Sequence, residues 1–280
     1  MSEQLATTAR ESLTDRRLYK FRSMSDDTQI QRLRDIVVGH RIHFSRPSEL
    51  NDPIEGKPIY ALGEWDAEAY RLMFAEWAWQ AQKKHIQNPP PRDVFLKWVL
   101  DQPRHVHEQL VASICSENHS EIDHKWRVLS LSAAPTHDLM WSHYADGHKG
   151  VALVLDASRG EFALAFKVTY IAERIPMDIT TQNLKEILCA TLLSKRVAWE
   201  YEQEFRCIAP EPPEPDSYRL EAEFLNFAPS RLLGIVFGAK TAPDSEAQIV
   251  EWVAERQSVL GLWKANINSA GGVDITPYDS

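Results

Sequence analysis

The sequence predicts an α+β protein with a mixed or antiparallel central sheet and a helical hairpin inserted into it. Short runs that alternate apolar and polar residues, typical of strands, occur in both halves of the chain, and a long amphipathic stretch separates them. Hydrophobic residues make up 44% of the 280 residues, which is enough for one continuous core. We therefore expect a flexible N-terminus at residues 1–17 and a single domain over residues 18–280.

The chain opens with a predicted strand, helix and strand. Residues 18–22 alternate in the manner of a half-buried strand. Ser25 is a suitable N-cap for a helix whose apolar residues fall on one face, and Gly39 follows the last of them. Residues 41–45 alternate again and predict the second strand.

Residues 64–118 differ in character from the rest of the chain. They carry two long amphipathic patterns rich in Trp, Ala, Gln and Lys, separated by Asn-Pro-Pro-Pro at residues 88–91. Because proline cannot continue a helix, this segment is predicted to be a helical hairpin inserted into the core or placed over it. Its Trp-rich surface is a candidate contact site for a partner.

The second half of the chain returns to strand patterns joined by short helices. Strands are predicted at residues 127–132, 150–155, 162–171, 204–209, 232–238 and 263–267, and helices near 182–195 and 244–257. This mixture of elements favours an α+β architecture over a regular parallel sheet.

Charge and cysteine content narrow the choice of partners and compartment. The net charge of -9 opposes non-specific binding to a nucleic-acid backbone. The widely separated Cys115, Cys189 and Cys207 have apolar neighbours, which predicts buried free thiols in a reducing compartment. No apolar run approaches the ~20 residues that cross a bilayer, and the polar start lacks the apolar core of a signal peptide. We expect a cytoplasmic protein without membrane contact.

The most informative stretch places Glu202 and Glu204 at the start of a predicted strand. Carboxylates two residues apart on extended backbone point to the same side, so both would face one cleft. Like charges held together raise at least one pKa, and a fold tolerates this mainly where a cation, a substrate or a proton transfer uses both groups. The alternative is a solvated edge strand whose carboxylates pair with Arg206 and Arg196.

Two other groups of polar residues invite a functional interpretation. His143, Asp146 and His148 could bind a metal ion, although the two histidines are five residues apart and not at the helical spacing of four. A tight turn stabilised by local hydrogen bonds is the preferred alternative. The loop Asn51-Asp52-Pro53, followed by Glu55-Gly56, has two acids near a rigid turn and could serve a cation or a ribose, but a turn capped by its own side chains is again preferred.

Several short motifs together resemble a widespread, uncharacterised bacterial family. They are Leu18-Tyr19-Lys20-Phe21-Arg22, Phe44-Ser45-Arg46-Pro47 with Asn51-Asp52-Pro53, Leu129-Ser130-Leu131-Ser132, Met140-Trp141-Ser142-His143-Tyr144-Ala145 and Glu202-Gln203-Glu204-Phe205-Arg206. The resemblance covers most of residues 18–240. It implies no settled activity, although the family looks like a relative of abortive-infection and toxin-type proteins.

A more distant resemblance has a sharper chemical meaning. Arg22, then Ser130-Leu131-Ser132, then Glu202-Gln203-Glu204 follow the order of motifs in ADP-ribosyltransferases of the arginine-serine-glutamate type. This resemblance implies a split central sheet, NAD as the substrate and no metal ion. The chain departs from that pattern at Leu131, where those enzymes often have Thr, and in the long interval between Arg22 and Ser130.

The same resemblance implies a role for each residue of the NAD site. Arg22 would hold the diphosphate, with Tyr19 beside it in the same site. Ser130 and Ser132 would position the second glutamate by hydrogen bonds. The catalytic pair would be Glu204, which stabilises positive charge on the ribose as nicotinamide leaves, and Glu202, which orients the acceptor. An aromatic ring such as that of Tyr144 would stack on nicotinamide or on the target.

The expected function is therefore NAD-dependent ADP-ribosyl transfer or NAD hydrolysis, in a toxin or a phage-defence effector. The acceptor would be a protein or a nucleic acid that the sequence does not identify. One alternative is a metal-dependent hydrolase or nuclease that uses His143, Asp146 and His148. The other is a non-catalytic binding or regulatory module whose partner contacts the Trp-rich helices.

Overall fold

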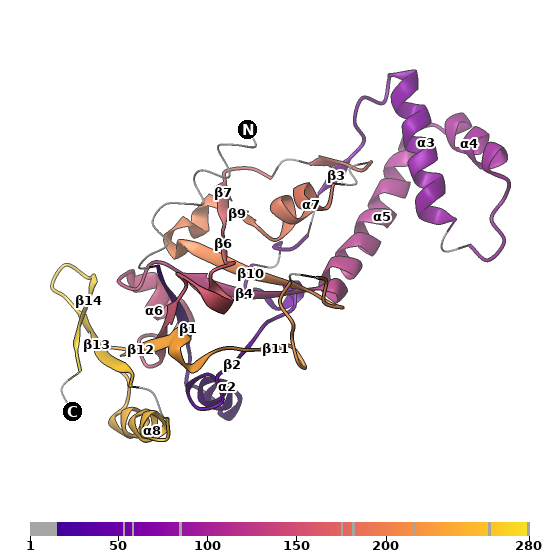
Figure 1. The fold of residues 1–280 in the computed structure, drawn as a ribbon. Helices are drawn as coiled ribbons and strands as arrows, with labels where there is room; N and C mark the ends of the chain where they lie inside the picture. The colour runs from indigo at the N-terminus through magenta and orange to yellow at the C-terminus, as the bar shows by residue number, and fades with distance from the viewer. Residues whose placement is uncertain are drawn as a thin grey trace.

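The structure, a computed structural model, describes residues 16–278 apart from 53, 58, 84–85, 175, 181–182, 216 and 257–258. Its centre is an eight-stranded sheet in the order β14-β13-β12-β5-β1-β4-β10-β6 (Figure 1). All neighbours in this sheet are antiparallel except β12 and β13. The α+β class with a mixed, mostly antiparallel sheet is confirmed.

The strands of this sheet come from both ends and from the middle of the chain. They are β1 (Arg17–Arg22), β4 (Trp126–Ser132), β5 (Val151–Asp156), β6 (Phe166–Lys167), β10 (Glu204–Pro210), β12 (Leu232–Phe237), β13 (Gly261–Ile267) and β14 (Val273–Pro277). The parallel pair is joined by α8 (Pro243–Ala254), because a parallel connection needs a crossover.

Two apolar layers cover opposite faces of the sheet. On one face α2 (Asp27–Val37) and α8 pack with side chains such as Leu18, Leu131 and Leu153. On the other face α6 (Asp138–Tyr144) packs with Phe21, and the fully buried Trp141 ring meets Phe21 edge to face at 5.1 Å. These layers fix β1 and α6 relative to each other, and both supply residues of the site described below.

The sheet is interrupted between β1 and β4. These strands share a single residue pair, Tyr19 with Ser132, whereas β1 and β5 pair along their whole length. Further along β4, Val128 exchanges two backbone hydrogen bonds with Ser45, at 2.8 and 2.9 Å. The segment after β2 (Arg41–His43) thus replaces β1 as the neighbour of β4. Between these two contacts the strands leave a gap.

The insertion contains three helices rather than a two-helix hairpin. They are α3 (Glu68–Gln82), α4 (Arg92–Asp101) and α5 (Arg104–Lys125), and they project from the sheet at the upper right of Figure 1. The second predicted helix is divided because Pro103 stands where the backbone turns, so that α4 ends before it and α5 begins after it. Apolar side chains of the three helices form their own cluster around Phe74, Phe95 and Val99.

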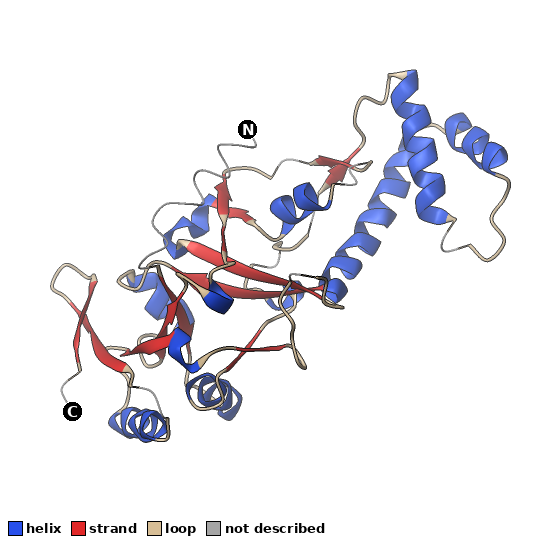
Figure 2. Ribbon diagram, viewed as in Figure 1, coloured by secondary structure: helices blue, strands red, loops and turns tan. Residues whose placement is uncertain are grey.

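The remaining elements are a short helix, short strands and 3₁₀ turns outside the central sheet (Figure 2). They are α7 (Leu184–Thr191), the short strands β3 (Tyr60–Ala61), β7 (Thr169–Ile171), β8 (Met177–Asp178), β9 (Ser194–Arg196) and β11 (Phe224–Asn226), and the 3₁₀ turns η2 (Pro47–Glu49), η3 (Gly160–Phe162), η4 (Val197–Glu202) and η5 (Pro229–Arg231). Within the part of the chain that the structure describes, no helix has the length and apolar character to cross a bilayer.

Most predicted elements are found, with shifts that have local causes. The first helix is capped by Asp26 and not by Ser25, because the Asp26 carboxylate accepts from Gln29 N at 2.9 Å. The strand expected at residues 162–171 is broken into η3, β6 and β7, and β14 was not predicted. The expected flexible N-terminus falls almost wholly outside the described residues, and the single-domain boundary at residue 18 stays a prediction.

Candidate functional site

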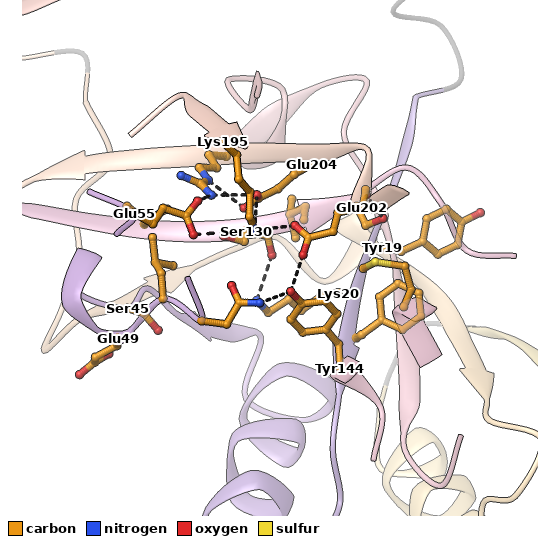
Figure 3. Close-up of a pocket in the computed structure, with 18 of the residues that line it drawn as sticks. Tyr19, Lys20, Ser45, Glu49, Glu55, Ser130, Tyr144, Lys195, Glu202 and Glu204 are labelled. Atoms are coloured by element: carbon orange, nitrogen blue, oxygen red, sulfur yellow. Dashed lines mark hydrogen bonds and ion pairs between the residues drawn. The ribbon is translucent and has the colours of Figure 1, made fainter. Parts of the chain in front are cut away.

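A cavity of about 200 Å³ lies at the gap between β1 and β4. The residues assigned to catalysis and to the NAD site by their motifs all line it: Tyr19, Arg22, Ser130, Ser132, Tyr144, Glu202 and Glu204. Residues that the motifs did not single out also line it, among them Lys20, Asn51, Glu55, Lys195 and Arg206. Figure 3 shows the carboxylates of Glu55, Glu202 and Glu204 together with Lys195 on one side of this cavity. The fold thus gathers side chains more than 100 residues apart in sequence, such as Lys20 and Ser130.

Glu202 and Glu204 face the cavity together, but not for the reason that two-residue spacing on a strand suggests. Glu202 ends the 3₁₀ turn η4, and Gln203 adopts a left-handed conformation with φ of 44° before β10 begins at Glu204. The turn and the strand therefore deliver one carboxylate each. Both side chains are buried, with 3% of Glu202 and 4% of Glu204 exposed. The alternative of a solvated edge strand is wrong, since β10 lies between β4 and β6.

Glu204 is held by a fully buried guanidinium. Arg206 donates from Nε to one carboxylate oxygen of Glu204 at 2.7 Å and from Nη2 to the other at 2.8 Å. Its Nη1 donates to the Leu192 carbonyl at 2.7 Å, and its Nη2 also pairs with Glu55. Arg206 thus has a partner for each of its three nitrogens, which a buried guanidinium requires.

Lys195 joins the two glutamates from β9, the short strand just before η4. Its Nζ lies 2.6 Å from Glu202 Oε2, 3.3 Å from Glu204 Oε2 and 3.7 Å from Glu55 Oε2. The other oxygen of Glu202 accepts a hydrogen bond from the Tyr144 hydroxyl, visible in Figure 3 as Tyr144 reaching towards Glu202. The cluster holds three carboxylates and two cations, so it carries one excess negative charge when every group is ionised.

The environments of Glu202 and Glu204 separate their acidities. Burial acts to raise the pKa of Glu204, but the Arg206 guanidinium and the Lys195 ammonium outweigh it and hold this pKa at about 2. Burial raises the pKa of Glu202 above its usual value, and the Glu204 carboxylate adds to the rise, against the opposing effect of Lys195. One carboxylate is a permanent anion and its neighbour is the better proton acceptor, which is a division of roles found in acid-base sites.

The cavity is also lined by two cations, which come from β1 on the other side of β4 from Glu204. Lys20 and Arg22 are two residues apart on β1 and half-buried. Lys20 Nζ donates to the Ser130 carbonyl at 2.9 Å, and Arg22 Nε is buried with no hydrogen-bond partner among the described residues. Burial, with Arg22 adding to it, lowers the pKa of Lys20 to about 7, and burial together with Arg32 lowers that of Arg22 to about 10.

The two serines are placed differently from each other. The Ser132 hydroxyl donates to the Glu202 backbone carbonyl at 2.5 Å and accepts from Ala134 N at 3.0 Å, so it fixes the backbone of the glutamate turn. The Ser130 hydroxyl is buried beside the Glu204 carboxylate and, after Arg206 and Lys195, contributes to its low pKa, but it lacks a well-aligned hydrogen bond. The expected positioning of Glu204 by both serines stays a prediction.

The three residues of the metal alternative do not converge. His143 Nδ1 lies 2.9 Å from the Tyr201 hydroxyl, whereas the buried His148 pairs through Nε2 with Asp138 at 3.0 Å. Asp146 lies on the turn between them at a positive φ of 48°. No group of three or more His, Cys, Asp or Glu side chains is arranged to hold a metal ion within the described residues. The expected turn at Asp146 is present, but His143 and Tyr144 contact side chains rather than its backbone.

The loop after η2 forms the predicted turn and also reaches the site. Asp52 Oδ1 accepts from Ile54 N at 3.2 Å, which closes an Asx turn, and Arg196 pairs with the same carboxylate at 3.4 Å. The preceding Asn51 side chain donates to the Tyr144 hydroxyl. Pro53 lies outside the described residues. The predicted turn is therefore confirmed at Asp52. Asn51 links this loop to Glu202 through the Tyr144 hydroxyl.

The expected partner surface on the insertion and the expected burial of the cysteines are borne out only in part. Apolar side chains are exposed on the insertion, with Trp98 and Val94 on α4 and Leu72 and Met73 on α3 each about half exposed. A partner for this surface stays a prediction. The cysteines are all free, as expected, but only Cys207 is buried, and Cys189 is exposed on α7.

Sequence reasoning missed the cations that neutralise the glutamates inside the protein. Lys195 lies on a short strand with no motif around it, and Arg206 was expected to pair only at a solvated surface. Lys20 was also overlooked as a site residue, and Glu55 was considered only as part of the loop after Asn51. Lys20 and Arg22 are two residues apart in the predicted strand at residues 18–22, and two cations on one face of a half-buried strand were a signal of this site.

Comparison with known proteins gives one match. Residues 140–207 match the sequence model of a family described as a protein of unknown function, DUF2971. This span begins within α6 and includes both glutamates, and over these residues it confirms the expected resemblance to an uncharacterised family. No curated protein and no solved structure matches the chain.

Proposed function

We propose that the protein cleaves the bond between nicotinamide and ribose in NAD, and passes the ADP-ribosyl group to water or to an acceptor. The observation that carries this proposal is the presence of both charges in the lining of the cavity: Lys20 and Arg22 come from β1 on one side of β4, and Glu204, with Glu202 just before it, from β10 on the other side. NAD has the complementary polarity, since a diphosphate lies one ribose away from a cationic nicotinamide ring.

The division of acidity between the glutamates fits the two steps of this reaction. Glu204, with its pKa of about 2, is an anion at any working pH and stabilises the positive charge that develops on the ribose as neutral nicotinamide leaves with the bonding electrons. Glu202, whose pKa is raised, accepts the proton of the water or acceptor that forms the new bond to the ribose carbon.

The size of the cavity limits how much of the substrate it encloses. At about 200 Å³ it is smaller than the roughly 300–1,000 Å³ of pockets that bury a whole drug-sized ligand. We place the nicotinamide ribose and the adjoining phosphate inside, and the adenosine outside. Asn51 and Tyr144, which meet at the edge of the carboxylate cluster, would close over the ribose.

The test is the release of nicotinamide from NAD by the purified full chain, with and without cell lysate as a source of acceptors. Wild type should release nicotinamide, and Glu202→Gln and Arg22→Met should each lose most of this activity. Glu121→Gln is the matched control, because Glu121 is an exposed residue of α5 that pairs with Lys125 and does not line the cavity. Absence of release from wild type under both conditions would overturn the proposal.

A further inference from the structure

Lys20 has no part in the motif-based site, yet the structure gives it an unusual position. It lies on β1 immediately after the single residue pair that joins β1 to β4, where the two strands begin to separate. Backbone groups of alternate residues point to the same side of an antiparallel strand, so Ser130 directs its carbonyl into the gap between Val128 and Ser132. Lys20 Nζ fills the place of the missing strand by donating to that carbonyl at 2.9 Å.

The charge of Lys20 and Arg22 lacks compensation at close range. Neither side chain forms a salt bridge with a described residue, and the one recorded partner of Lys20 is a neutral carbonyl. The titratable and charged groups around the Lys20 amine are Arg22 on the same strand, Arg32 on α2, and Glu204 and Cys207 on β10. Two half-buried cations so close together repel each other unless an anion lies between them.

We infer that Lys20 is a second anion-binding residue beside Arg22, and that it takes up a proton from solvent when a diphosphate enters the cavity. The identity of the ligand rests on the proposed function, but the behaviour of the cationic pair does not. A bound phosphate group brings negative charge next to both side chains and favours the ammonium form of Lys20 over the amine.

This inference has a consequence for binding as the pH changes. Burial lowers the pKa of free Lys20 to about 7, so the amine form predominates in alkaline solution. Above this pH each additional unit should weaken diphosphate binding by up to about tenfold, because the proton must be acquired as the ligand binds. His43 also lines the cavity, but burial lowers its pKa below the usual value and it is neutral in this range.

The experiment is calorimetric titration of the full-length protein with ADP-ribose, whose diphosphate diester does not titrate near neutral pH. Measurements in two buffers of different ionisation enthalpy give the number of protons taken up. Wild type should bind more weakly as the pH rises from about 7 to about 9, with uptake approaching one proton. Lys20→Arg, which is always charged, should bind with no proton uptake over the same range.

Two further variants test whether the charge of Lys20 itself is responsible for the binding and the proton uptake. Lys20→Met, of similar length and without charge, should bind ADP-ribose at least about tenfold more weakly and with no proton uptake. Lys149→Met is the matched control, because Lys149 is exposed on the turn after α6 and should leave both quantities unchanged. Wild-type binding that is independent of pH and releases or takes up no proton would overturn the inference, as would equal affinity in Lys20→Met.

Sulfate, a dianion without nucleoside, separates this inference from the proposed reaction. If sulfate binds with the same dependence on Lys20 while NAD releases no nicotinamide, the anion site stands and the proposed function fails. If nicotinamide is released but neither sulfate nor ADP-ribose binding depends on Lys20, the function stands and the inference about Lys20 is wrong.

Discussion

Arg206 donates to both carboxylate oxygens of Glu204, at 2.7 and 2.8 Å, although the two residues are separated by only one position on the same strand. The pair is almost completely buried. Breaking a buried ion pair leaves one charge without a partner, which costs more than an exposed pair is worth. Glu204 is therefore a structural residue as well as a candidate catalytic one, and the two roles need separate measurements.

Glu204→Gln should reduce both activity and stability. Loss of the carboxylate leaves Arg206 and Lys195 short of negative charge, with an expected loss of about 3–5 kcal/mol in the free energy of unfolding. The folded-state pKa of about 2 lies below the ordinary value, so the stability that Glu204 contributes is present above about pH 4.5 and is lost as the pH falls towards 2. Denaturant unfolding of both proteins should show their difference narrowing over that range. A constant difference would contradict the assigned pairing.

Tyr144→Phe should shift the pH dependence of activity rather than abolish it. The Tyr144 hydroxyl donates to Glu202, and this hydrogen bond lowers the pKa of Glu202. Its removal raises that pKa further, so the acidic limb of the pH profile of nicotinamide release should move to higher pH. Tyr170→Phe is a suitable comparison, because the Tyr170 hydroxyl accepts a hydrogen bond from the backbone N–H of Glu204 and not from Glu202. An unchanged acidic limb would remove Glu202 from the role of proton acceptor.

Lys20→Met should change how stability depends on pH. In wild type the folded state holds fewer protons than the unfolded chain between about pH 7 and about 10.5, so its free energy of unfolding rises with pH in that window. The variant lacks this contribution. Its stability relative to wild type should be greatest near neutral pH and should decline as the pH rises, as measured by urea unfolding. A relative stability that does not vary with pH would mean that Lys20 titrates normally.

Two glycines near the site test how closely the backbone packs around Arg22. A Cβ atom at Gly150 would lie 2.1 Å from the Arg22 carbonyl, whereas one at Gly147 would contact nothing within 4 Å. Gly147→Ala should cost about 1–2 kcal/mol, from its positive φ of 59°. Gly150→Ala should cost more and should also weaken binding of ADP-ribose by displacing Arg22. Equal stability of the two variants would contradict the close approach.

The sequence predicts the strands of the sheet and the residues of the cavity more successfully than the contacts among them. Alternation and motif order led to β1, β4, β5, β10 and β12 because half-buried strands leave a period of two. They gave no sign of Lys195, since a cation on a short strand between a helix and a turn looks like any surface lysine. Nor did they indicate that Glu204 also stabilises the fold, which follows from its buried ion pair with Arg206.

Because β1 and β4 share a single residue pair, Tyr19 with Ser132, the central sheet is divided into two parts that meet at this pair. The part that contains β1 carries Lys20 and Arg22, and the part that contains β4 and β10 carries Glu204 beside Glu202. A ligand that bears both signs of charge can therefore contact both parts of the sheet, whereas a simple anion is attracted to the part that carries Lys20 and Arg22. The charge pattern of a ligand would thus decide whether it bridges the two parts of the sheet or binds to one of them.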